Sequence, residues 1–139
     1  MRFAETDANQ HVSQVSYLVY CEEARTRLLA ERVPAFDWFS GQHTLVLVRQ
    51  WIDYQAPAHF PDRLDVWSAP VRLGTSSIRL AHVITREDPA GHTAIAQGES
   101  TMVLVDAEAG TSLPWPDAVR AEWAAGLRPE LALPFDRPR

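Results

Sequence analysis

The side chains best suited to catalysis lie in one segment of the chain, residues 6–17. It stands directly before the strongest helical pattern in the sequence. A carboxylate at this place, Asp7, would be stabilised in its ionised form by the partial positive charge and free N–H groups of a helix start. The same N–H groups can hold an oxyanion. Together with the amide of Asn9 and the imidazole of His11, Asp7 suits activation of water or attack on a carbonyl.

The same residues also have a purely structural interpretation. Asp and Asn side chains often accept hydrogen bonds from nearby backbone N–H groups and so stabilise turns. Asp7 and Asn9 could cap a turn in this way, while His11 packs against a sheet. The spacing of these residues leaves both interpretations open.

The elements that must position these residues begin with one long helix, expected from about Val15 to Arg32. Apolar or small side chains recur there at spacings of four and three: Tyr17, Cys21, Ala24 and Leu28. Ser13 or Ser16 is the expected N-cap, and Pro34 ends the helix.

A sheet is expected after the helix, because β-branched and aromatic residues then alternate with turn signals. The expected strands are Thr44–Tyr54, Leu64–Leu73, Ser76–Arg86 and His92–Val105. Residues 2–6 could be the end of a further, short strand, Pro70 indicates an edge or a bulge, and residues 88–91 a hairpin connection. The four strands are predicted to form an antiparallel meander. One helix and one sheet must bury each other, so the fold class is α+β.

The last part of the chain holds a short helix, Asp117–Ala125, and a proline-containing tail. We expect a single domain over residues 1–139, with a core over 1–118 and the short helix and tail over 119–139.

The composition excludes several kinds of chemistry. The 139 residues carry a net charge of -5, and all 13 Lys and Arg residues are arginine. Without lysine, Schiff-base chemistry and a phosphate-binding P-loop are excluded. The single cysteine excludes an intrachain disulfide and a zinc site built from paired cysteines. The negative net charge argues against nucleic-acid binding. No stretch of the sequence has the pattern of a membrane span or of a signal peptide. A cytoplasmic protein is therefore expected.

The segment from Thr6 to Arg25, TDANQHVSQVSYLVYCEEAR, resembles the signature of the hotdog-fold acyl-CoA thioesterases of the 4-hydroxybenzoyl-CoA thioesterase type. In that family a Thr-Asp pair is followed by Gly-His-Val or a similar step, an Asn- or Ser-containing helix start, Tyr-Leu, and Glu-Ala-Arg. Residues 52–58, 60–62 and 72–77 resemble later elements of the family in the same order. The resemblance covers roughly residues 2–118 and implies a hotdog fold, one long helix wrapped by an antiparallel sheet.

The resemblance further implies a thioester hydrolase acting on an acyl-CoA or an acyl-carrier-protein thioester. The residue matching Asp7 is the nucleophile or general base in such enzymes, and a backbone N–H at a helix start polarises the carbonyl. Asn9 and His11 are implied as catalytic by a similar pattern in plant acyl-carrier-protein thioesterases. The sequence departs from the family at residues 13–14, Ser-Gln instead of Asn-Asn, and in a shorter first strand. Either the natural chain begins earlier or the edge of the sheet is trimmed.

Coenzyme A would be part of the substrate, so no separate cofactor is expected. Its phosphates would have to be met by arginine, whose planar fork suits phosphate oxygens. Arg72 and Arg79 flank the turn that resembles the family's nucleotide-contacting region, and Ser76 and Ser77 could add hydroxyl contacts. Tyr17 could line an acyl pocket, although its place on the apolar stripe also suits the core. The histidines have no ligand spacing, so no metal site is expected.

The resemblance also implies an assembly and leaves two other functions open. Hotdog proteins commonly pair sheets edge to edge with active sites between subunits, so a homodimer or homotetramer is expected. A non-catalytic acyl-CoA-binding or regulatory module on the same fold is one alternative. A hotdog hydratase or dehydratase is the other.

Overall fold

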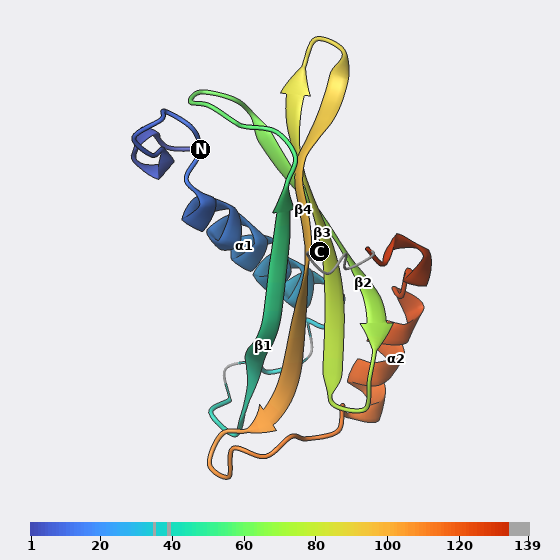
Figure 1. Ribbon diagram of the computed structural model, residues 1–139. Coiled ribbons are helices and arrows are strands. Elements are labelled where there is room, and N and C mark those ends of the chain that lie inside the picture. The colour runs from blue at the N-terminus through green and yellow to red at the C-terminus, as the bar shows by residue number, and fades with distance from the viewer. Residues whose placement is uncertain (35, 39, 134–139) are drawn as a thin grey trace, which may run out of the picture.

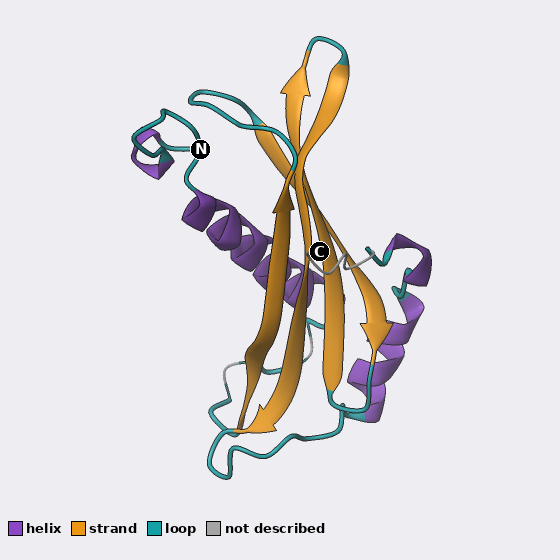
Figure 2. Cartoon of the chain, in the orientation of Figure 1, coloured by secondary structure: helices purple, strands orange, loops and turns teal. Residues whose placement is uncertain are grey.

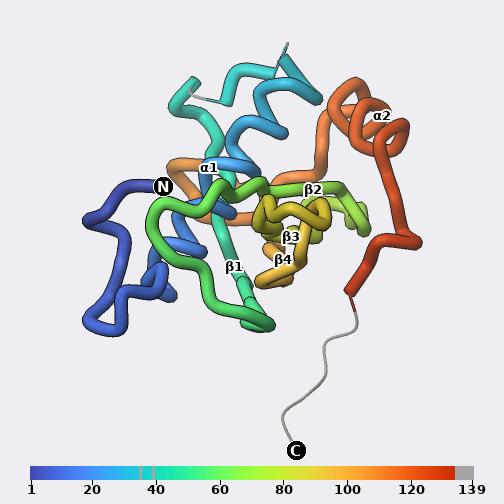
Figure 3. The backbone as a smooth tube through the Cα atoms, turned by 90° about the horizontal axis from the view of Figure 1, so that it is seen from above, coloured from blue at the N-terminus to red at the C-terminus, as the bar shows by residue number. Residues whose placement is uncertain are grey.

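One long helix lies across one face of a four-stranded antiparallel sheet in the computed structural model, which describes residues 1–34, 36–38 and 40–133 (Figures 1 and 2). The helices are α1, Gln14–Arg32, and α2, Asp117–Ala125; the strands are β1, His43–Tyr54, β2, Leu64–Leu73, β3, Ser77–Asp88, and β4, Gly91–Asp106. Figure 3 shows α1 and α2 on the same side of the sheet. The expected α+β class is confirmed.

The sheet is not the simple meander expected from the sequence. Its strand order is β1-β4-β3-β2, so only β2, β3 and β4 pair consecutively, and β1 pairs with β4. A tight hairpin between β1 and β2 would need a loop of about two to five residues. The connection over residues 55–63 is longer, and the Ala58 carbonyl accepts a hydrogen bond from Val12 N–H at 2.8 Å. This loop is tied to the segment before α1 instead.

The expected strand over residues 2–6 is also wrong, because the chain forms a 3-10 turn at Phe3–Glu5. The Glu5 side chain stabilises the turn: its carboxylate accepts from Arg2 N–H at 2.7 Å and from Arg2 Nε at 2.9 Å. This reciprocal capping pattern satisfies the backbone locally. Thr6 makes an isolated antiparallel bridge to Val12.

The expected signals at Pro70 and residues 88–91 are confirmed. β2 is an edge strand, and its pairing with β3 shifts register between Pro70 and Arg72. Residues 88–91 join β3 to β4 as a hairpin. Beyond α2, Arg128 N–H donates to the Pro70 carbonyl at 2.7 Å, so the chain runs along this edge. The end of the tail, residues 134–139, lies outside the described residues.

The core consists of two apolar clusters on the helix side of the sheet. One surrounds Trp123 of α2 and contains Ile78, Leu80, Met102 and Leu104. The other lies under the first half of α1 and contains Tyr17, Cys21, Ile84 and Ile95. His82 lies on the same face of β3 as Leu80 and Ile84, because side chains two residues apart share a face. A buried polar group therefore separates the two clusters.

Candidate active site

The loop over residues 7–11 folds around the carboxylate of Asp7. Asp7 Oδ1 accepts the backbone N–H of Asn9 at 2.8 Å and that of His11 at 3.2 Å. The Asp7 backbone N–H donates to the His11 carbonyl at 2.8 Å. Because both hydrogen bonds to the carboxylate use Oδ1, Oδ2 is the oxygen to which no donor of the described residues is bonded. Asp7 can therefore stabilise the loop through Oδ1 and still use Oδ2 for a reaction with water or a carbonyl.

Gln10 closes this loop in the left-handed region, with φ at 63°. It is the only residue other than glycine with positive φ among the described residues, and its N–H donates to the Asp7 carbonyl at 3.0 Å. This backbone conformation costs a side-chain-bearing residue about 1–2 kcal/mol. The chain thus carries a local strain next to the candidate catalytic carboxylate.

We expect Gln10→Gly to raise the free energy of unfolding by about 0.5–1 kcal/mol, because glycine removes this strain but costs more entropy on folding. Urea denaturation would measure the change. Arg27→Gly is the control, since Arg27 is exposed in the interior of α1 and glycine there should lower stability by about 1 kcal/mol. A lower stability of Gln10→Gly than of the wild type would contradict this interpretation.

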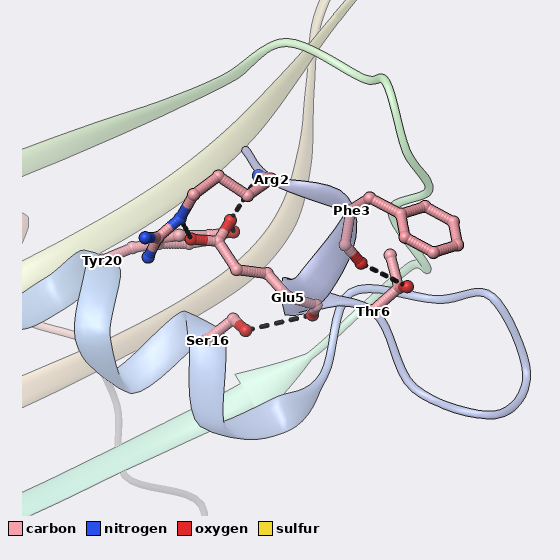
Figure 4. A network of polar contacts seen from close by, with 6 residues as sticks. All are labelled: Arg2, Phe3, Glu5, Thr6, Ser16 and Tyr20. Atoms are coloured by element: carbon pink, nitrogen blue, oxygen red, sulfur yellow. Dashed lines mark hydrogen bonds and ion pairs between the residues drawn. The ribbon is translucent and has the colours of Figure 1, made fainter.

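The start of α1 is fixed by Glu5 rather than by a serine cap. Ser13 is at the N-cap, but its hydroxyl makes no capping hydrogen bond. Instead, the Ser13 N–H donates to the Glu5 carbonyl at 2.8 Å. The Ser16 hydroxyl donates to the same carbonyl at 3.1 Å (Figure 4). The Glu5 carboxylate also accepts from the Tyr20 hydroxyl at 2.8 Å. Glu5 therefore couples the N-terminal turn to the first two turns of α1.

The surroundings of Glu5 and of Tyr20 shift the pKa values of both side chains. The hydrogen bond from the Arg2 backbone, followed by that from Tyr20, lowers the pKa of Glu5 to about 2. Burial, and then the Glu5 carboxylate, raise the pKa of Tyr20 well above its ordinary value. An ionised carboxylate held by neutral and cationic donors is a stable arrangement at neutral pH.

A second loop meets the candidate site through His59. His11 and His59 form an isolated antiparallel bridge, and their imidazole rings lie edge to face with centroids 4.8 Å apart. Phe3 and Phe60 make a similar contact beside them, with centroids 5.8 Å apart. His59 is not among the site residues expected from the sequence. A histidine shortly before a strand is only a weak signal when the pairing of the loops is unknown.

Tyr17 lies in the core. Only 3% of it is exposed, and its ring contacts Tyr54 and Tyr20 with centroids 5.3 and 6.2 Å away. Burial raises the pKa of its hydroxyl. Within one chain Tyr17 therefore supports the α1 start beneath the Asp7 loop and does not face an open pocket.

Arg72 and Arg79 lie directly opposite each other on β2 and β3, on the face of the sheet away from α1. Arg79 and Arg49 both pair with Thr101 of β4, so the three arginines occupy one transverse row. Arg49 is not among the site residues expected from the sequence, because its place in this row depends on the β1–β4 pairing. The row borders a cavity of about 410 Å³, whose other lining residues include Val48, Trp51, Gly74, Ser77, Glu99 and Thr101.

Glu99 balances part of the positive charge of the arginine row. The buried carboxylate of Glu99 accepts from Arg79 Nη1 at 3.3 Å and from the Leu133 N–H at 2.9 Å. The Ser76 and Ser77 carbonyls serve the fold, accepting from Leu104 N–H and from Trp115 Nε1. Among the described residues that line this cavity, Arg72 and Arg79 present guanidinium forks that suit an anion.

The structure does not bring the arginine row to the Asp7 loop within one chain. His59 contacts the Asp7 loop just before β2 begins at Leu64, whereas Arg72 is near the other end of β2. The stretch of strand between Leu64 and Arg72 corresponds to about 26 Å. Asp7, Asn9 and His11 are brought together, while Arg72, Ser76, Ser77 and Arg79 form a separate group.

Among the described residues, no group of three or more His, Cys, Asp or Glu side chains is placed to hold a metal ion. No described helix has the length and apolar character needed to cross a bilayer.

Comparison with known proteins gives the family. A profile of the thioesterase-like superfamily matches residues 1–123. The chain belongs to this superfamily. Among the relatives of this chain, the long-chain acyl-CoA thioesterase FadM of Escherichia coli (strain K12) is 36% identical over 101 residues, which are 72% of this chain and 74% of FadM.

Solved structures of thioesterase-superfamily and related proteins share this architecture. The PA5185 protein of Pseudomonas aeruginosa is 28% identical with a TM-score of 0.80, covering 91% of this chain and 87% of that protein. A thioesterase of Thermus thermophilus, solved with coenzyme A and Zn, is 32% identical with a TM-score of 0.75, covering 90% of this chain and 88% of that protein. The expected hotdog fold is thus confirmed for this member of the superfamily.

Proposed function

We propose that this protein hydrolyses acyl-CoA thioesters and that the Asp7 loop is the place of the reaction. The observation that carries the proposal is the anchored carboxylate of Asp7, whose Oδ1 is fixed by two backbone N–H groups beside the start of α1. The similarity to FadM, a long-chain acyl-CoA thioesterase, supports the same reaction. The protein is then a thioester hydrolase that needs no cofactor.

In the general-base form of the reaction, Asp7 Oδ2 takes a proton from water as the water oxygen bonds to the thioester carbonyl carbon. The carbon–sulfur bond then breaks, and the departing thiolate takes up a proton. In the nucleophilic form, Asp7 itself attacks the carbonyl carbon, the carbon–sulfur bond breaks and the thiolate leaves, and water then hydrolyses the mixed anhydride to the free acid and the Asp7 carboxylate. Asn9 and His11 are proposed to orient water or the leaving group. Backbone N–H groups at the α1 start stabilise the oxyanion.

The arginine row is proposed to hold the phosphates of coenzyme A, with Arg72 and Arg79 as anion ligands and Ser76 and Ser77 as hydroxyl donors. Arginine forks bind phosphate oxygens bidentately, and the chain has no lysine to share this role. Since about 26 Å of strand separates the row from the Asp7 loop, we propose that these arginines serve a thioester bound at a neighbouring chain. An acyl-carrier-protein thioester is the alternative substrate for the same reaction.

The surface beside the Asp7 loop supports an active site shared between chains. Exposed apolar residues gather on one face of α1 and on the neighbouring edge strand β1: Val15, Leu18, Val19, Leu47 and Tyr54. Val15, the most exposed of them on α1 at 59%, is two residues beyond Ser13. β1 has one unpaired edge in the described sheet, and open edges favour pairing with another strand. We propose a homodimer or a dimer of dimers joined through this surface.

We expect Val19→Glu to weaken this assembly and to lower activity at least tenfold at micromolar concentration, because a charge would be buried in an apolar interface. Sedimentation would report the change in mass, and thiol release the change in activity. Ala30→Glu is the matched control, since Ala30 lies near the other end of α1. A wild-type protein that is active as a stable monomer would contradict the shared site.

Further properties belong to the same proposal. We propose that residues 1–139 act as one domain, that Tyr17 supports the acyl-binding wall from the core, and that the protein works in the cytoplasm. An aromatic substrate of the 4-hydroxybenzoyl type and a long aliphatic chain are both compatible with the reaction. The rates of hydrolysis of a panel of aromatic and long-chain acyl-CoA thioesters would distinguish these two substrate classes.

A further inference from the structure

His59 holds a fixed position although it is exposed. Its N–H donates to Asp62 Oδ2 at 2.9 Å, and its carbonyl accepts from the Asp62 N–H at 2.7 Å. The preceding residue, Ala58, is fully buried and bonded to Val12. Arg86 donates to the Pro57 carbonyl at 3.1 Å and lies 3.9 Å from the Asp62 carboxylate. The backbone of this loop is therefore tied on both sides of His59.

The ring of His59 meets the ring of His11 at an interplanar angle of 82°, with centroids 4.8 Å apart. The two residues are also direct partners in the antiparallel bridge. Directly opposite side chains in such a bridge constrain each other, and edge-to-face aromatic pairs have a preferred geometry. The backbone of His11 is in turn bonded to Asp7 in both directions. A fixed His59 ring thus restricts the orientation of an imidazole beside the candidate carboxylate.

We propose that His59 is a positioning residue for the hydrolytic reaction, acting through His11. This inference rests on the proposed function. A half-buried imidazole on a loop has several rotamers, and the ring of His59 removes those that would overlap it. His11 is then held ready to orient water or the leaving group, and the benefit is realised in the rate of the chemical step.

The test compares kcat and KM of the wild type, His59→Ala, His59→Phe, His11→Ala and the His11→Ala/His59→Ala double variant, on an acyl-CoA that the wild type hydrolyses. We expect His59→Ala to lower kcat about tenfold with little change in KM. His59→Phe should keep most of the activity, because phenylalanine retains a ring for the edge-to-face contact. The double variant should be no slower than His11→Ala, because a residue that acts through His11 has no effect without it.

His92→Ala is the control, since His92 is an exposed histidine whose edge-to-face contact is with Trp67 and not with a residue of the Asp7 loop. Its activity should equal that of the wild type. An unchanged His59→Ala, a His59→Phe as slow as His59→Ala, or independent effects of the two histidines would each overturn the proposal. An inactive wild type would instead refute the proposed function itself. Thermal unfolding of His59→Ala and His59→Phe identifies any loss caused by misfolding.

Discussion

Asp7→Asn is expected to lower the rate of thioester hydrolysis at least about 100-fold while the protein stays folded. Asparagine keeps an oxygen that can accept the Asn9 and His11 N–H groups, so the loop should retain its shape. It has no negative charge and can neither take a proton from water nor attack a carbonyl. Thiol release from an acyl-CoA would measure the activity, and urea denaturation the stability.

Asp106→Asn provides a closely matched control. Asp106 Oδ1 also accepts two backbone N–H groups, from Glu108 at 3.0 Å and from Ala109 at 2.7 Å, in the turn after β4. Asp106→Asn thus also replaces a carboxylate that stabilises a turn by an amide, but at a different end of the sheet. Asp106→Asn should retain wild-type activity. Full activity of Asp7→Asn would remove Asp7 from the mechanism.

The second large effect is a loss of stability in mild acid, caused by His82. The residue is 1% exposed, and its ring is hydrogen-bonded to Ser68 at 2.7 Å and to Ser100 at 3.0 Å. Burial, with a smaller contribution from the Arg25 guanidinium, lowers the pKa of His82 from 6.5 to about 4. The folded protein therefore keeps this imidazole neutral at pH values where an unfolded chain would protonate it.

The sign of the effect follows from proton binding. Between pH 6.5 and about 4 the unfolded chain binds a proton at His82 and the folded protein does not. The free energy of unfolding should therefore fall as the pH falls through this window, by roughly 3 kcal/mol in total. Above pH 6.5 this contribution is fully present. The lowered pKa of Glu5, about 2, acts in the same direction but at more acid pH.

Urea denaturation at pH 7, 5.5 and 4 would measure this dependence. His82→Gln should flatten it whatever its effect on stability at pH 7, whereas His92→Gln should leave it unchanged. Equal wild-type stability at pH 7 and pH 4 would contradict the burial of a neutral His82.

The helices and strands could be predicted from the sequence because their signals are local. The apolar spacing from Tyr17 to Leu28 lies within one helix, and the alternation in Leu64–Leu73 within one strand. Strand order could not be predicted, because β1 pairs with β4, which is distant in the sequence. Nor could the turn at Phe3–Glu5, which depends on a contact between the Arg2 and Glu5 side chains that competes with a strand.

The residues of the candidate site likewise fall into those that could be grouped from the sequence and those that could not. Asp7, Asn9 and His11 could be grouped from sequence because one short loop contains them all. His59 could not, because it meets His11 only after residues 55–63 fold back on the segment before α1. The row of Arg49, Arg79 and Arg72 likewise arises from the register of three strand pairings. Side chains joined by tertiary pairing leave no spacing signal in the sequence.

The most direct test of the central claim is thiol release by the wild-type protein from a panel of short, long and aromatic acyl-CoA thioesters and an acyl-carrier-protein thioester. We predict that at least one of them is hydrolysed, with one thiol released for each free acid formed. Tight binding of acyl-CoA without any thiol release would contradict the claim and favour a non-catalytic module. Conversion of an enoyl thioester without thiol release would contradict it in favour of a hydratase.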